Sequence, residues 1–104
     1  MKCKYRFEIL GFALLCAACA GAPKPDDQMV SAQSALRAAD EVGSAKVPQA
    51  QLHAQLAKEQ IARAKQLIED GENAEAKRVL LRAKADAELA VALSRKADAA
   101  RGLE

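Results

Sequence analysis

The stretch "PQAQLHAQLAKEQIARAKQLIEDGENAEAKRVLLRAKADAELAVALSRKADAAR", residues 48–101, decides the fold through the spacing of its small and apolar side chains. Before the turn "DGEN" (70–73), residues spaced alternately four and three apart form one stripe: Ala50, Ala54, Ala57, Ile61, Ala64 and Ile68. After the turn the same alternation recurs: Ala76, Leu80, Ala83, Ala87, Ala90 and Ser94. Because this spacing marks one face of an α-helix, both segments are predicted to be helical.

The two stripes fall into register when the chain folds back at "DGEN". Ile68 then meets Ala76 beside the turn, and Ala50 meets Ser94 at the far end. The pairs between them are Ala64 with Leu80, Ile61 with Ala83, Ala57 with Ala87 and Ala54 with Ala90. Two independent helices would not be expected to match in this way. The sequence therefore predicts an antiparallel hairpin about 35 Å long, with helices over about 48–70 and 73–101, whose facing stripes we call the seam.

A shorter helix is predicted ahead of the hairpin, over about residues 27–42. Asp26 or Asp27 suits its N-cap, and Gly43 suits its C-terminal end. Its apolar stripe is Met29, Ala32, Leu36 and Ala39. The expected fold is therefore all-α, a small helical hairpin that the shorter helix completes into a three-helix unit.

Five leucines of the hairpin lie off the seam: Leu52, Leu56, Leu67, Leu89 and Leu93. One interpretation is that the first helix covers part of this surface, with Leu36 near Leu56 and Ala39 near Leu52. The other is that some of the surface stays open for a partner or a second copy, because an alanine seam in so short a chain is a marginal core.

The N-terminus has the pattern of an export signal. Met1–Glu8 is short and net positive, and Ile9–Ala18 ("ILGFALLCAA") is an apolar run that ends in small residues. As a helix this run rises only about 15 Å, half of the hydrocarbon core of a bilayer. Residues 1–18 are therefore predicted to be a cleaved signal peptide and not a membrane span.

The stretch "LLCAAC" (14–19) resembles the lipobox of bacterial lipoproteins, in which small residues precede a cysteine that is lipidated and becomes the mature N-terminus. Two alanines precede Cys19, whereas two bulky leucines precede Cys16, so Cys19 is the predicted lipidation site. The departure from the lipobox is Cys16, which stands where leucine is usual. The resemblance implies attachment to a membrane through the lipid, and Ala20 implies the outer membrane, facing the periplasm.

Two other roles for the cysteines are a disulfide between Cys16 and Cys19, or half of a metal site. A metal site needs two more ligands, and the chain after residue 19 offers no cysteine and one histidine, His53. Cleavage would remove the other two cysteines, which favours lipidation. We expect a lipidated N-terminus and short linker over 19–26, a helical periplasmic domain over 27–104, and no metal.

Composition and charge exclude several function classes. Lys2, Lys4 and Arg6, against Glu8, account for the formal net charge of +2. The chain after residue 18 is therefore formally neutral, and no nucleic-acid binding is expected. Aromatic residues make up 3% of the chain and alanine about a quarter. An alanine seam does not easily enclose a cavity, so no small-molecule substrate or cofactor is expected.

No catalytic motif accompanies His53, which is interpreted as a surface residue, and the protein is not expected to be an enzyme. Charged side chains form mixed pairs at helical spacing, such as Glu59 with Arg63 and Lys84 with Glu88. The basic cluster "KRVLLRAK" (77–84) is flanked by acidic residues. It is interpreted as a solvated helix face and not as a site for anionic headgroups.

The stretch "SAQSALRAADEVGSAKVPQAQLHAQLAKEQIARAKQLIEDGENAEAKRVLLRAKADAELAVA" (31–92) resembles small exported lipoproteins of the family named domain of unknown function 4398. An alanine-rich helix, a glycine turn, a proline-led helix and repeated "A-x-x-x-A" steps carry the resemblance. It implies a helical envelope domain, sometimes attached to a peptidoglycan-binding domain of the OmpA type. It implies no activity and no functional residues.

The expected function is that of a lipid-anchored, periplasm-facing helical module that binds an unidentified envelope protein, or a second copy of itself, without catalysis. The alternative is a structural spacer associated with the cell wall, similar to the major outer-membrane lipoprotein. That protein is a long coiled coil with large apolar residues. The alanine seam and the interrupting glycines favour the interaction module.

Overall fold

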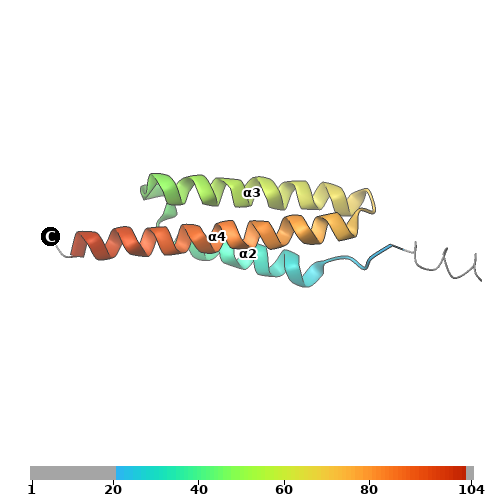
Figure 1. Cartoon of the computed structure of the whole chain (residues 1–104), viewed down its shortest axis with the longest axis horizontal. Helices are drawn as coiled ribbons and strands as arrows, with labels where there is room; N and C mark the ends of the chain where they lie inside the picture. Colours follow the sequence, from blue (N-terminus) through green and yellow to red (C-terminus); the bar gives the residue numbers. More distant parts are fainter. Residues whose placement is uncertain (1–20, 103–104) are drawn as a thin grey trace, which may run out of the picture.

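Three α-helices and one short 3-10 helix make up the structure, a computed structural model that describes residues 21–102 (Figure 1). In chain order they are α2 (Asp26–Glu41), η1 (Ser44–Lys46), α3 (Pro48–Glu69) and α4 (Asn73–Gly102). The predicted all-α class and its three helices are confirmed, and each helix end lies within one residue of its predicted position. The predicted signal peptide and Cys19 lie outside the described residues.

Gly71 makes the turn between α3 and α4 by adopting a φ of 79°. Its N–H donates to the Ile68 carbonyl at 3.0 Å, and the Glu72 N–H donates to the Leu67 carbonyl at 2.8 Å. These two bonds satisfy carbonyls that the end of α3 leaves without helical partners. A positive φ favours glycine, which has no Cβ, so this residue fixes the position of the turn.

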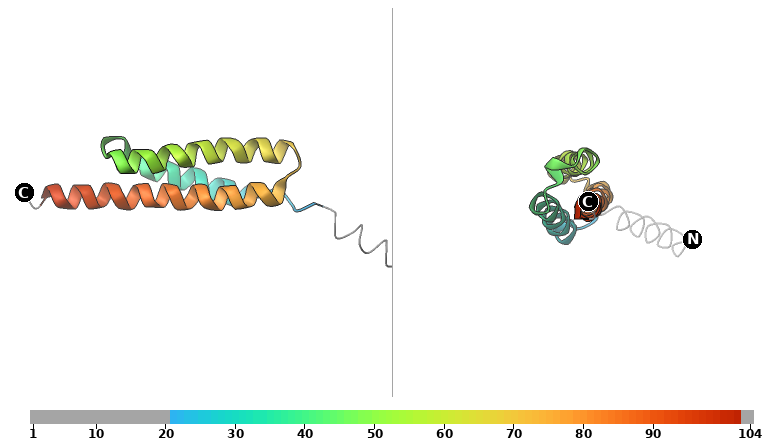
Figure 2. Two further views of the ribbon diagram at one scale, coloured as in Figure 1. Left: turned by 45° about the horizontal axis from the view of Figure 1, so that its top comes forward. Right: turned by 90° about the vertical axis from the view of Figure 1, so that its left-hand side faces the viewer.

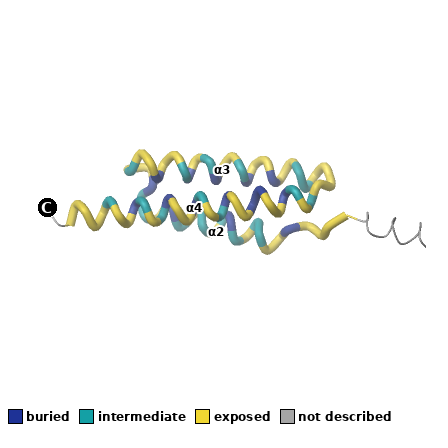
Figure 3. The backbone as a smooth tube through the Cα atoms, in the orientation of Figure 1, coloured by how far each residue is buried: buried dark blue, intermediate teal, exposed yellow. Residues whose placement is uncertain are grey.

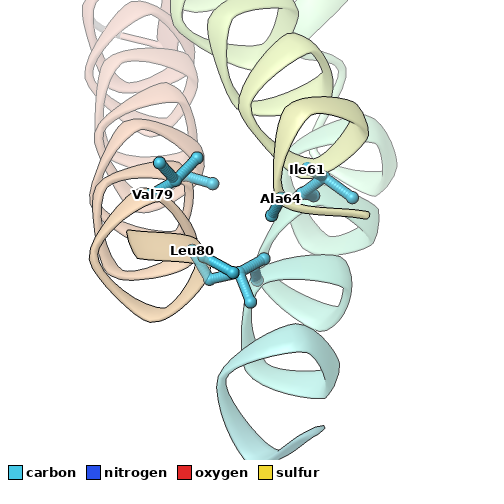
Figure 4. Packing of buried hydrophobic residues seen from close by; sticks show 7 residues of the cluster. Ile61, Ala64, Val79 and Leu80 are labelled. Carbon is cyan, nitrogen blue, oxygen red and sulfur yellow. The ribbon is translucent and has the colours of Figure 1, made fainter. Parts of the chain in front are cut away.

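α3 and α4 pack along the predicted seam. All members of the seam are buried except Ile68, which is half-buried near the turn. Leu80 is the largest fully buried side chain, and it reaches from α4 into the space between the helices (Figure 4). Ser94, the one polar member, donates its hydroxyl to the Ala90 carbonyl at 2.8 Å and so leaves no unsatisfied donor. The predicted seam is confirmed.

α2 packs beside the hairpin and contacts both α3 and α4, so the three helices form a triangle when viewed end-on (Figure 2). Near the turn, Ala32 of α2 joins a buried cluster of hairpin residues: Ile61, Ala64, Ala76, Val79, Leu80 and Ala83. Farther along, Ala39 joins a second cluster: Ala50, Ala54 and Ala90. Leu36 packs against both clusters. The buried positions therefore follow the inner sides of the helices, with exposed residues outside (Figure 3).

The prediction that α2 covers Leu52 is wrong. Leu52 is 58% exposed, and Ala39 packs instead against the second cluster. The α3 residues that border the groove between α2 and α3 are Lys58, Ile61, Ala62 and Lys65. Lys58 Nζ also lies 4.0 Å from the Asp40 carboxylate of α2. α2 takes this flank because its alanines approach the seam closely, whereas a layer of leucines would hold the helix farther away.

The ends of α2 differ from the sequence prediction in two details. Pro25, and not Asp26 or Asp27, occupies the N-cap, and both aspartates lie in the first turn. There their charges interact favourably with the positive end of the helix dipole. Gly43 follows α2 with a φ of 81°, as its predicted role requires, but Ser44–Lys46 then form η1, a short helix that the sequence did not predict.

Candidate functional site

The linker ahead of α2 docks onto the start of α4. The structure describes this linker from Gly21, so the predicted lipidation site, Cys19, lies just outside the described residues. The Ala22 carbonyl accepts a hydrogen bond from Asn73 Nδ2 at 3.0 Å, and Pro25 is buried. Since Asn73 is the first residue of α4, the chain enters the bundle beside the turn that joins α3 to α4 (Figure 1).

A hollow at this docking point is lined by the linker, the first residues of α2, and Asn73 and Lys77 of α4. The Lys24 carbonyl accepts from the Asp26 N–H, and the Pro25 carbonyl accepts from the Met29 N–H, both at 3.0 Å. The linker therefore runs straight into α2 as part of the folded unit. We call the linker 21–25 together with the turn 70–73 the turn end of the bundle.

A second surface is the face of the hairpin that is turned away from α2, which we call the outer hairpin face. The flank of α4 that faces α2 carries Lys84, Glu88 and Val91, which line the groove between these two helices. The outer hairpin face is formed by residues at helical spacing on the flanks of α3 and α4 that point away from α2: His53, Leu56, Gln60, Asp86 and Leu89. No helix of the described chain covers this face (Figure 2).

A polar cluster joins α3 to α4 at the centre of this face. His53 Nδ1 lies 3.0 Å from Asp86 Oδ1, and Gln60 Nε2 donates to Asp86 Oδ2 at 2.9 Å. Because a carboxylate oxygen accepts, the imidazole donates to it through Nδ1. The side chains of His53 and Asp86 are 27% and 18% exposed. The arrangement can recognise a polar group while it holds the two helices together.

Apolar side chains flank the polar cluster. Leu89 is 42% exposed and Leu56 is half-buried. Leu67 and Leu93 are half-buried and pack partly against the two core clusters. Apolar surface thus lies close to a His–Asp pair on the outer hairpin face.

His53 lies at the surface, as interpreted from the sequence, but its side chain is half-buried and bonded across the hairpin, which the sequence did not predict. Asp86 lies 33 residues after His53 in the chain. Along α4, Asp86 lies within about two turns of the residue that faces His53 in the register of the seam. The seam therefore brings the two residues into the same region of the hairpin, and the rotation of the helices about their axes decides the contact. Motifs that pair a histidine with a serine or cysteine nucleophile do not include such a contact.

Charged side chains elsewhere on α4 pair with neighbours on the same helix. Lys84 Nζ lies 3.8 Å from Glu88, which confirms that predicted pair, and Arg78 bonds Glu75. The Arg78 guanidinium holds the pKa of the Glu75 carboxyl below its usual range, first by its hydrogen bond and then by its charge. The basic stretch 77–84 is thus balanced by carboxylates.

Two further features concern residues 21–102 only. No helix in this range combines the length and the apolarity needed to cross a membrane. No group of three or more His, Cys, Asp or Glu side chains in the same range is arranged to hold a metal ion.

The comparisons with known proteins agree with the resemblance noted in the sequence. A family model described as "Domain of unknown function (DUF4398)" matches residues 27–104, which include η1, α3, α4 and nearly all of α2. No curated protein and no solved structure matches the chain. The match spans most of the sequence, and the chain therefore belongs to the family of the domain of unknown function DUF4398.

Proposed function

We propose that the protein is a lipoprotein of the bacterial cell envelope, anchored in the outer membrane through Cys19, whose helical unit binds a protein partner in the periplasm. The anchor is supported by the sequence "LLCAAC" (14–19) and by the short positive and apolar segments before it. An acyl chain contributes about 0.8 kcal/mol for each buried methylene, so several chains on one cysteine make attachment effectively permanent.

The observation that carries the binding proposal is the uncovered outer hairpin face. Its exposed Leu89 and half-buried Leu56 lie close to the polar pair of His53 and Asp86. Burial of such leucines in an interface would contribute about 25 cal/mol per Å² of apolar area. The polar pair would add directional contacts that select one partner over another.

The binding is proposed to occur without catalysis. A His–Asp pair is part of many hydrolytic sites, where the imidazole activates a serine or cysteine nucleophile. α3 contains no serine, threonine, tyrosine or cysteine, and Ser94 is the one such residue of α4. The Ser94 hydroxyl is buried and donates to the Ala90 carbonyl, so it is not available to His53.

The anchor is tested by replacing Cys19 with serine and separating the membranes from the soluble periplasm of the host cell. The Cys19→Ser protein is expected in the soluble fraction, whereas Cys16→Ser, the matched control, is expected to stay with the outer membrane. Undiminished membrane retention of Cys19→Ser would refute the anchor.

The binding surface is tested by placing a photo-crosslinking amino acid at Leu89 in intact cells, with exposed Ser34 of α2 as the control position. A discrete adduct is expected from position 89 and not from position 34. An adduct of twice the mass of the chain would identify a second copy as the partner. Equal labelling from both positions, or none from either, would contradict a specific surface at this face.

A further inference from the structure

We infer that the bundle stands on the lipid surface on its turn end, so that α4 runs away from the membrane toward Gly102. The inference rests on the proposed lipid at Cys19 and adds which surface of the bundle faces the bilayer. The turn end faces the headgroup layer of the same membrane that holds the acyl chains. The short tether places it there, since Asp70 and Glu72 of the turn supply no positive charge to attract lipid.

The chain between the lipid and the turn end is too short for the bundle to turn over. Cys19 and Ala22 are three residues apart, so their Cα atoms are separated by at most about 11 Å in any conformation. The Ala22 carbonyl is held by Asn73 Nδ2 at 3.0 Å, and Pro25 is buried. The turn end therefore stays within about one helix diameter of the acylated residue.

The opposite end of the bundle lies far from this attachment point. α4 has 30 residues and is therefore about 45 Å long. α2 begins beside the turn end and runs parallel to α4, so the linker leaves from one end of the bundle and Gly102 lies at the other (Figure 1). A lipid at Cys19 cannot bring both ends to the membrane unless the bundle lies flat.

The long sides of the bundle have few features that would bind them to the lipid surface. The four exposed large apolar residues of the described chain do not share one surface. Val30 and Leu81 line neighbouring hollows between α2 and α4, and Leu52 lies among Pro48 and two glutamines at the start of α3. Leu89 lies on the outer hairpin face. Binding of a helix to an interface needs one apolar side, and attraction to anionic lipid needs an excess of positive charge. The chain after residue 18 is formally neutral.

An upright bundle fixes the height of the outer hairpin face. Leu89 lies about 24 Å along α4 from Asn73. A protein that binds there has to present its surface at about that distance from the headgroups. The partner is therefore a domain that projects into the periplasm and not a segment embedded in the lipid.

The orientation is tested on the processed, lipidated protein in phosphatidylcholine vesicles that contain a lipid with a fluorescence quencher on its headgroup. One free cysteine is introduced either at exposed Glu72 beside the turn or at exposed Arg101 near the far end, and labelled with the same fluorophore. The fluorescence at position 72 is expected to fall several-fold when the quencher is present, and that at position 101 is expected to stay constant.

Flotation of the protein with the vesicles, measured in the same samples, separates the two proposals. Protein that does not float contradicts the lipid anchor and the orientation with it. Protein that floats but is quenched equally at both positions, more strongly at 101, or at neither, overturns the orientation while the anchor stands.

Asn73→Asp provides a second test, because a carboxylate keeps the shape of the side chain but cannot donate to the Ala22 carbonyl. This variant is expected to float as before and to lose at least half of the difference in quenching between positions 72 and 101. Lys77→Gln, which alters the same hollow without removing the bond, should leave the difference unchanged. An unchanged difference in Asn73→Asp would show that Asn73 does not hold the linker.

Discussion

His53 Nδ1 lies 3.0 Å from Asp86 Oδ1, and this contact joins α3 to α4 across the outer hairpin face. Asp86 also accepts from Gln60, which lies two helical turns beyond His53, so one carboxylate holds two separate points of α3. Alanine methyl groups constrain the sliding and rotation of packed helices only weakly, because they project so little. The polar cluster therefore selects one arrangement among those that the seam permits.

Asp86→Ala tests this role. The substitution removes both bonds and leaves the His53 and Gln60 donors without their acceptor, so the free energy of unfolding should fall by about 1–3 kcal/mol. Urea denaturation of the Cys19→Ser protein, followed by circular dichroism, measures the loss. Glu88→Ala, which removes an exposed pair with Lys84, should cost no more than about 0.5 kcal/mol. Equal losses from the two variants would argue against the polar cluster as the selecting contact.

Ala87→Leu tests the close approach of α3 and α4. Ala87 is fully buried in the seam, so a larger side chain has to push the helices apart, at a cost of about 1–3 kcal/mol. Ala85→Leu, on the exposed side of the same helix, should change the stability by less than about 0.5 kcal/mol. Thermal unfolding gives both values. A leucine at position 87 that is tolerated as well as one at position 85 would mean that the seam is loosely packed.

Gly71→Ala tests the turn. No atom lies within 4 Å of the position that a Cβ would take, so the cost arises from the φ of 79° alone and should be about 1–2 kcal/mol. Gly102→Ala provides the control, because the added Cβ also meets open space and its φ is not positive. A melting temperature that falls for position 71 and stays constant for position 102 is the expected result.

The Glu75 carboxyl should titrate below its ordinary pKa of 4.5 because Arg78 bonds and attracts its charged form. A lowered pKa in the folded state means that the stabilisation from this pair is complete above pH 4.5 and is lost as the pH falls through the folded value. Arg78→Ala should return the Glu75 pKa toward 4.5, as measured by NMR titration of the side chain. Lys77→Ala, at the neighbouring position, should leave it unchanged.

The hairpin could be predicted from the sequence because its information is periodic. The stripes from Ala50 to Ile68 and from Ala76 to Ser94 share one spacing, and glycine marks the turn between them. Burial of these residues followed directly from that pattern. The position of Gly71 settled where the chain reverses, since few other residues accept its backbone conformation.

The side on which α2 docks could not be predicted in the same way. Hydrophobicity pointed to the leucines near Leu52, but α2 lies on the flank that carries Lys58 and Ala62. Close contact between Ala39 and the seam decided the outcome, and this depends on the shape of the assembled hairpin and on η1. The bond between His53 and Asp86 likewise depends on how the two helices are rotated about their axes, which spacing alone does not give.

The alanine seam restricts how the protein can change during evolution. A buried alanine can be shortened only to glycine, which costs about 1 kcal/mol in a helix, and a side chain longer than serine has to separate α3 from α4. A core of leucines accepts exchanges with isoleucine or methionine, but an alanine such as Ala57 or Ala83 can be replaced without a change of spacing only by a residue as small as the Ser94 of the same seam. We therefore expect related chains to keep the spacing of these alanines while their outward residues diverge. What the family shares would then lie inside the bundle, and what distinguishes its members would lie on the surface.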